Sequence, residues 1–127
     1  RVLIEQLVAQ AMQEPQAWQL RVLAREVLAP SSHLQVLFQD EALPKMLLVK
    51  RLLSEITGIP AEDPAVTRCL MNVITPCLML LVGGRTFPGP LKEVFQMPPQ
   101  MVADHLFHFA MGGLGAIARE YAERARA

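Results

Sequence analysis

Three polar side chains in the C-terminal third of the chain have the spacing of metal ligands. His105 and His108 lie three positions apart and Asp104 lies four positions before His108, so one face of a helix can present all of them. The sequence has no HExxH motif and no paired CxxC motifs that would complete a recognised metal site. A polar stripe at an interface or cavity edge is therefore the favoured interpretation, and a small metal-assisted helical enzyme is the alternative.

Cys69 and Cys77 are the only cysteines, and each could form a nucleophilic pair with a histidine. They lie eight positions apart on one predicted helix, too far along its axis for a disulfide, and reduced thiols suit an intracellular, cytoplasmic protein. Both lie in an apolar segment, where a buried thiol is usually inert. Since the sequence also lacks a GxSxG motif and a glycine-rich phosphate loop, we predict no enzymatic activity, no cofactor and no metal.

Arg25 and Asn72 are polar residues in largely apolar surroundings. Arg25 follows Trp18 by seven positions and shares a partly apolar helix face with it. A half-buried guanidinium needs an acceptor, which Glu26, Asn72 or an anionic ligand would supply, whereas an ordinary surface arginine needs none. Pro76 leaves the Asn72 carbonyl without its usual donor, so the helix either bends there or lines a cavity.

Prolines, glycines and capping residues divide the chain into helices. Aromatic residues make up 6% of the sequence and no alternating strand pattern occurs, so we predict an all-α domain of five to six helices. Ser32 with Gln35 forms a capping box, Gly58 is a stop, and Asp63 with Pro64 opens a helix. The predicted helices span about 1–13, 15–29, 32–57 with an interruption at Pro44, 63–82 and 98–124, and 83–97 is expected to be a loop.

The last two predicted helices are apolar on nearly all sides. Between Cys69 and Val82 the polar side chains are Asn72 and Thr75, and the segment 101–118 carries only three strongly polar ones. One small domain cannot bury two such helices, so we expect a homodimer in which they form a four-helix bundle with their symmetry mates. The run to Val82 is 14 residues, shorter than the roughly 20 that span a membrane, so no membrane association is expected.

Small residues in the last helix suggest where the two copies meet. Gly112, Gly113, Gly115 and Ala116 cluster in mid-helix, where each glycine costs about 1 kcal/mol relative to alanine. That cost is explained if another backbone approaches closely, either from a second copy or at a crowded crossing within one monomer. Lysines and arginines equal aspartates and glutamates at 12 each, which excludes a strongly basic nucleic-acid binder.

Two short segments carry a family resemblance. REVLAPS at 25–31 and GIPAEDP at 58–64 resemble the C-terminal domain of TetR-type transcription regulators, in particular the CecR-like branch. The resemblance spans essentially the whole chain, 1–127, although the segment 83–97 has no residue-by-residue match. It implies a homodimer through the last two helices and a small-molecule pocket among the earlier helices and the fourth. Its helix-turn-helix would lie before Arg1, so operator DNA would be bound only through that N-terminal part.

The leading hypothesis is therefore the effector-sensing and dimerisation domain of a TetR-like repressor. A ligand that prefers one arrangement of the helices would change the spacing of the DNA-binding heads. A helical interaction module without ligand is the main alternative. The candidates for the effector pocket are Trp18, Arg25, His33, Leu37, Cys69, Asn72, Val73 and Phe87. The candidates for the dimer interface are Leu106, Ala110, Gly113, Leu114 and Ile117.

Overall fold

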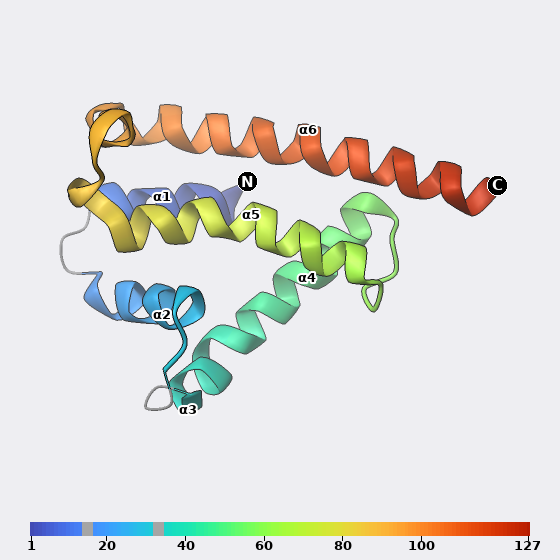
Figure 1. The fold of residues 1–127 in the computed structure, drawn as a ribbon, viewed down its shortest axis with the longest axis horizontal. Coiled ribbons are helices and arrows are strands. Elements are labelled where there is room, and N and C mark those ends of the chain that lie inside the picture. Colours follow the sequence, from blue (N-terminus) through green and yellow to red (C-terminus); the bar gives the residue numbers. More distant parts are fainter. Residues whose placement is uncertain (14–16, 32–34) are drawn as a thin grey trace.

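The computed structural model describes residues 1–13, 17–31 and 35–127, apart from the side chains of Leu37 and Arg85. Over these residues the fold is all-helical, which confirms the predicted class (Figure 1). The helices are α1 (Val2–Gln13), α2 (Trp18–Leu28), α3 (Gln35–Leu37), α4 (Leu43–Thr57), α5 (Pro64–Gly83) and α6 (Pro99–Arg126). A π-helical turn, η1 (Phe38–Ala42), precedes α4, and two 3-10 segments, η2 (Gly84–Thr86) and η3 (Gly89–Gln96), connect α5 to α6.

The predicted boundary between α4 and α5 is confirmed. Gly58 ends α4 with φ 72°, in the left-handed region that favours glycine, and its N–H donates to the Ser54 carbonyl at 2.9 Å. The Asp63 side chain then accepts a hydrogen bond from the Ala65 N–H at 2.9 Å, while Pro64 occupies the first helical position. Both caps follow from residue type, which is why the sequence located them.

Two predicted segments differ from the structure. The interruption expected at Pro44 lies just before it, as the π-helical turn η1 between α3 and α4, and Pro44 falls in the first turn of α4, where its missing N–H is not needed. The predicted loop 83–97 is wound into η2 and η3. Pro15 and Ser32, expected at helix starts, lie outside the described residues, and α2 begins only at Trp18.

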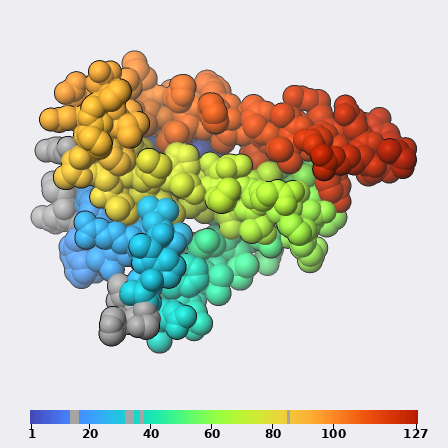
Figure 2. Space-filling model, in the orientation of Figure 1, coloured from blue at the N-terminus to red at the C-terminus, as the bar shows by residue number. Residues whose placement is uncertain are grey.

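Helix α5 is the centre of the fold. Helices α1, α2 and α4 all pack against it, whereas α6 lies mainly along α1 and touches α5 at few positions. One core cluster joins α1, α2, α5 and α6 around Val8, Cys77 and Leu81, and a second joins α4, α5 and α6 around Val66 and Leu114. The C-terminal part of α6 projects past the other helices (Figures 1 and 2).

Helices α5 and α6 are both apolar, but the chain buries a larger share of α5 than of α6. By length and composition both helices would be able to cross a membrane, a property that core helices of soluble proteins share. In the most apolar 18-residue window of each, 39% of residues are buried in α5 but only 17% in α6. The chain alone therefore covers part of α5 and leaves most of α6 open.

Candidate effector cavity and dimer face

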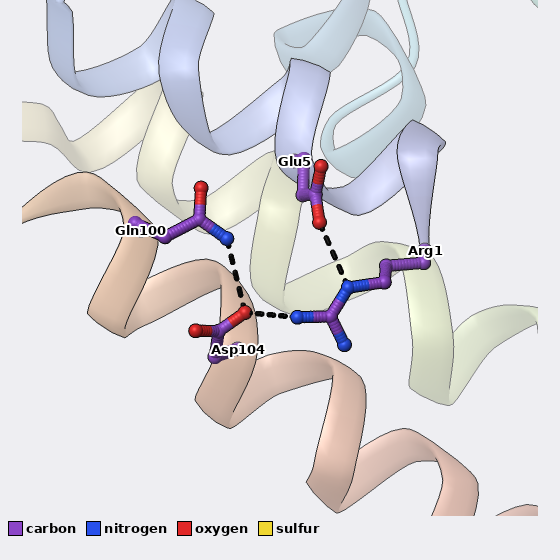
Figure 3. A network of polar contacts seen from close by, with 4 residues as sticks. All are labelled: Arg1, Glu5, Gln100 and Asp104. Atoms are coloured by element: carbon purple, nitrogen blue, oxygen red, sulfur yellow. Dashed lines mark hydrogen bonds and ion pairs between the residues drawn. The ribbon is translucent and has the colours of Figure 1, made fainter.

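Asp104, a candidate metal ligand, is held in a polar network between α1 and α6 (Figure 3). Its Oδ1 accepts a hydrogen bond from Gln100 Nε2 at 3.0 Å and another from the Arg1 guanidinium. Arg1 Nε in turn donates to Glu5 Oε1 at 2.9 Å. The carboxylate thus ties the start of α6 to α1.

The two histidines of the same helix turn make ring contacts instead of converging with Asp104. The His105 ring stacks on Phe109 with centroids 6.4 Å apart, and the His108 ring lies 5.9 Å from that of Phe107. Within residues 1–13, 17–31 and 35–127, no group of three His, Cys, Asp or Glu side chains is placed to hold a metal ion. The metal-assisted alternative therefore has no ligand set in this part of the chain.

Both cysteines of α5 are free and buried. Burial raises the pKa of Cys69, an effect that the nearby Arg68 partly opposes, and it raises the pKa of Cys77 to about 11. A thiol of that kind stays protonated at neutral pH and is a poor nucleophile. The two side chains are consequently packing residues, as their apolar surroundings predict.

An apolar groove of about 590 Å³ runs between α5 and α6, where the two helices diverge. Three residues predicted for the pocket and four predicted for the interface line this one groove. The predictions had assigned them to two separate sites. We call this surface the α5–α6 face. The residues that line it are Cys69, Asn72, Val73, Thr75, Pro76, Met79, Phe109, Ala110, Gly113, Leu114, Ala116 and Ile117.

Phe109 is the most exposed large apolar side chain of the α5–α6 face. The ring is 77% exposed, an unusual state for a phenylalanine in mid-helix, and it is absent from the residues singled out in the sequence. Its position one turn before Gly113 would have identified it. Leu106, by contrast, packs against the first core cluster and does not line the groove.

The mid-helix glycines of α6 do not lie at a crowded crossing inside the monomer. A Cβ added to Gly112 or Gly113 meets no atom within 4 Å, and one added to Gly115 meets only the Arg119 guanidinium at 3.6 Å. Crowding within one monomer, one of the two explanations offered for the cluster, is therefore wrong for the described residues. The lack of a side chain at Gly112 and Gly113 leaves the backbone of α6 open to the outside.

A smaller cavity of about 110 Å³, which we call the inner cavity, lies among α1, α2, α4 and α5. It exists because α2 and α4 both pack on α5 but scarcely touch each other, and because Ala24 and Ala42 are too short to fill the gap. Among the described residues that line it, every side chain except Lys45 is apolar. They are Leu3, Leu7, Leu20, Leu23, Ala24, Val27, Ala42, Lys45, Met46, Val49, Ile74 and Leu78.

A wider groove of about 540 Å³ adjoins this cavity between α2 and the start of α4. The two share Leu20, Leu23 and Lys45, and the groove alone is lined by Trp18 and Glu41. Of the predicted pocket residues that the structure describes, none lines this cavity, and Trp18 lies in the groove beside it. Helical spacing marks leucines of α1 and α2 as core, but it does not show that the core is incompletely filled.

Arg25 and Phe87 lie away from this cavity. Arg25 lines a separate cleft of about 360 Å³ with Arg21 and Phe95, and no hydrogen bond or ion pair joins it to Glu26 or Asn72. Phe87 packs edge-to-face on Phe95, with ring centroids 5.9 Å apart. His33 lies outside the described residues, as does the side chain of Leu37.

Glu26 accepts hydrogen bonds from Ser31, and not from Arg25 as considered from the sequence. It is a buried charged side chain, and its carboxylate accepts hydrogen bonds from the Ser31 N–H at 2.7 Å and the Ser31 hydroxyl at 3.0 Å. These bonds fix the turn that follows α2, within the segment REVLAPS. Arg25 is thereby free of Glu26, and its guanidinium remains at the surface.

The comparison with protein families agrees with both short segments. Residues 1–117 match the family described as HTH-type transcriptional dual regulator CecR, C-terminal domain. No curated protein matches the chain. The family match includes the Glu26–Ser31 turn, the Gly58 stop and the Asp63 cap, and it leaves out only residues 118–127. The chain therefore belongs to the CecR C-terminal domain family, and it is a C-terminal domain of a TetR-type transcription regulator.

Proposed function

We propose that this chain is the effector-sensing and homodimerisation domain of a TetR-like repressor. A second copy would cover the α5–α6 face, a small molecule would occupy the inner cavity, and DNA-binding heads in front of Arg1 would carry the operator contacts. The chain itself would catalyse no reaction. The family assignment supports the regulator class, and the packing of α5 and α6 supports the dimer.

The observation that carries the proposal is the exposure of the α5–α6 face. Phe109, which is 77% exposed, lies close to Gly112 and Gly113, where an added Cβ would meet no neighbouring atom within 4 Å. Burying an aromatic side chain is worth about 1.5–3 kcal/mol, and two copies would bury it twice. A two-fold dimer pairs the same surface with itself, so one apolar groove is enough to form the whole interface.

Helix α5 connects the two proposed sites. Ile74 and Leu78 face the inner cavity, while Asn72, Thr75 and Met79 line the α5–α6 face. A ligand that prefers one position of α5 would thus favour one arrangement of the dimer, and with it one separation of the DNA-binding heads. Heads of a dimer reach successive major grooves when they are roughly 34 Å apart.

The substitution Gly113→Leu tests the interface. A Cβ at this position meets no atom within 4 Å in the monomer, so the fold is expected to keep its stability. In a dimer the leucine side chain overfills a close crossing, which costs about 1–3 kcal/mol of association free energy. Sedimentation velocity across a range of protein concentrations measures the loss.

Gly115→Leu is the matched control. Gly115 is two positions further along α6, which turns the helix by about 200°, and it does not line the groove. The control is expected to dimerise like the parent chain. Equal dimerisation of the Gly113→Leu variant, the control and the parent would remove Gly113 from the interface.

An exposed apolar row on α4 favours the alternative of a protein-interaction module. Leu48, Leu52 and Ile56 follow one another by one helical turn, and each is about half exposed. If the purified chain is a monomer at every concentration, this module with a different protein as its partner becomes the better description.

A further inference from the structure

The lining of the inner cavity indicates which class of molecule it takes, an inference that rests on the function proposed above. Among the described residues that line it, Lys45 alone has a polar side chain, and that residue is exposed. An exposed lysine lays its methylene stem on apolar surface and keeps its ammonium group in water. The cavity wall accordingly presents almost no polar surface to an occupant.

This apolar wall decides against polar ligands. A polar ligand atom placed there loses its hydrogen bonds to water and gains none in return. For a neutral group this lowers the affinity about tenfold or more, and for a charged group the loss is greater still. Apolar atoms have the opposite balance, because they leave water and make van der Waals contacts with the leucine, isoleucine and methionine side chains of the wall.

The volume of the inner cavity limits the size of its occupant. An engineered apolar cavity of about 150 Å³ binds benzene, and the inner cavity is about 110 Å³. Leu3, which lines it, is 38% exposed, so the cavity reaches the protein surface and an occupant need not be fully enclosed. The space therefore suits a single small ring or a short branched alkane, and a large fused ring system is too big for it.

Two buried alanines create this space. Ala24 on α2 is 1% exposed and Ala42 at the end of η1 is 8% exposed, and each contributes only a methyl group to the wall. Helices α2 and α4 pack on α5 but scarcely on each other. A molecule between them would also touch Ile74 and Leu78 of α5, and it would supply the contact that α2 and α4 scarcely make.

We propose that the effector in the inner cavity is a small uncharged apolar molecule, about the size of benzene, held between α2 and α4 against α5. Its affinity rests on the apolar area that it removes from water. The α5–α6 face is apolar too, but Asn72 and Thr75 add polar groups to its lining, and in the proposed dimer a second copy covers it.

Benzene and pyridine are matched probes, because they share the shape of the ring and only pyridine carries a nitrogen that accepts a hydrogen bond. The δ1-methyl NMR signals of isoleucine report the place of binding, since Ile74 lines the inner cavity and Ile117 lines the α5–α6 face. The variant Ile74→Val assigns the Ile74 signal. We expect benzene to shift this signal saturably, at lower concentration than it affects Ile117, and pyridine to bind about tenfold more weakly.

Two variants test the place independently. Ala24→Leu is expected to occupy the cavity with its own side chain and to abolish the shift that benzene causes at Ile74. Ala125→Leu is the matched control at an exposed position of α6 that does not line the cavity, and it is expected to keep the shift. If circular dichroism shows that Ala24→Leu does not fold, Ala42→Leu fills the cavity from η1 and takes its place.

Any of four results would overturn this inference: no saturable shift at Ile74, a shift of Ile117 at equal or lower concentration, pyridine binding as tightly as benzene, or the same binding in the folded cavity-filling variant as in Ala125→Leu. Sedimentation of the same samples separates this inference from the proposed function. A dimer whose Ile74 signal does not respond to benzene loses only the effector class. A monomer that binds benzene at Ile74 loses the dimer and keeps the apolar site.

Discussion

At the scale of single residues, the buried carboxylate of Glu26 makes the contact that orders the end of α2. It accepts hydrogen bonds from both the N–H and the hydroxyl of Ser31. Glu26→Ala leaves these donors without that acceptor, so we expect a loss of about 1.5–3 kcal/mol in the free energy of unfolding. Urea denaturation followed by circular dichroism measures it.

Arg25→Ala is the control for that measurement, because the Arg25 side chain is exposed and takes no part in the Glu26–Ser31 hydrogen bonds of the turn. We expect it to change the free energy of unfolding by less than about 0.5 kcal/mol. An equal loss in both variants would mean that the segment is stabilised by something other than the Glu26–Ser31 bonds.

Cys77 is expected to make the domain less stable at alkaline pH. Burial raises the pKa of its thiol from 9.0 to about 11 in the folded chain. As the pH rises from 9 to 11, the unfolded chain therefore releases the thiol proton before the folded chain does, and stability falls. The expected loss is about 2–3 kcal/mol, and it is fully absent below pH 8.

The variant Cys77→Val isolates this contribution, since valine keeps the volume and removes the proton. Unfolding by urea at pH 8 and at pH 11 is compared in the parent and the variant. The parent is expected to lose more stability over this interval than the variant does. The same loss in both would show that other groups, such as Tyr121, whose pKa is raised by burial and by Asp63, account for it.

At the scale of elements, the junction of α5 with η2 depends on the absence of a side chain at Gly83. A Cβ there would lie 1.7 Å from Cε1 of the Phe87 ring, which also packs on Phe95. Gly83→Ala is expected to displace the ring and cost about 1–3 kcal/mol of folding stability. Thermal unfolding measures the change.

Gly115→Ala is the matched control on α6, where the added Cβ makes only an ordinary contact with Arg119. It should stabilise the domain, by up to about 1 kcal/mol, because alanine is the better helix former. Opposite signs for the two substitutions would confirm that Phe87, and not helix propensity, decides the result at Gly83. A gain in both would contradict the packing described for Phe87.

Helix boundaries could be predicted from the sequence, because their causes are local. Gly58, Asp63 and Pro64 act through their own backbone and side-chain chemistry. The winding of 83–97 into 3-10 segments had no such signal in the sequence, and within it Phe87 packs on Phe95. Local chemistry therefore located these helix ends, but it did not show how the connection between α5 and α6 is wound.

The candidate sites could be predicted only in part, because they depend on how helices are inclined to one another. From the sequence, Cys69, Asn72 and Val73 lie on a largely apolar helix. Only the divergence of α5 and α6 places them beside Gly113. The cavity at Ala24 likewise results from the separation of α2 and α4. The spacing of apolar residues along one helix does not determine the distance between two helices.

At the scale of the whole molecule, one chain leaves a large part of its apolar surface uncovered. The chain has equal numbers of acidic and basic residues, so no net charge keeps copies apart. Most of the apolar window of α6 is unburied, and the α5–α6 face lies alongside it. A second copy is the simplest cover for a surface of this kind.

Sedimentation equilibrium of the unmodified chain tests this claim most directly. We expect a particle of twice the 14.1 kDa chain mass that dissociates only on dilution. A single species of one chain mass at every concentration, with Phe109 still exposed to solvent, would contradict it.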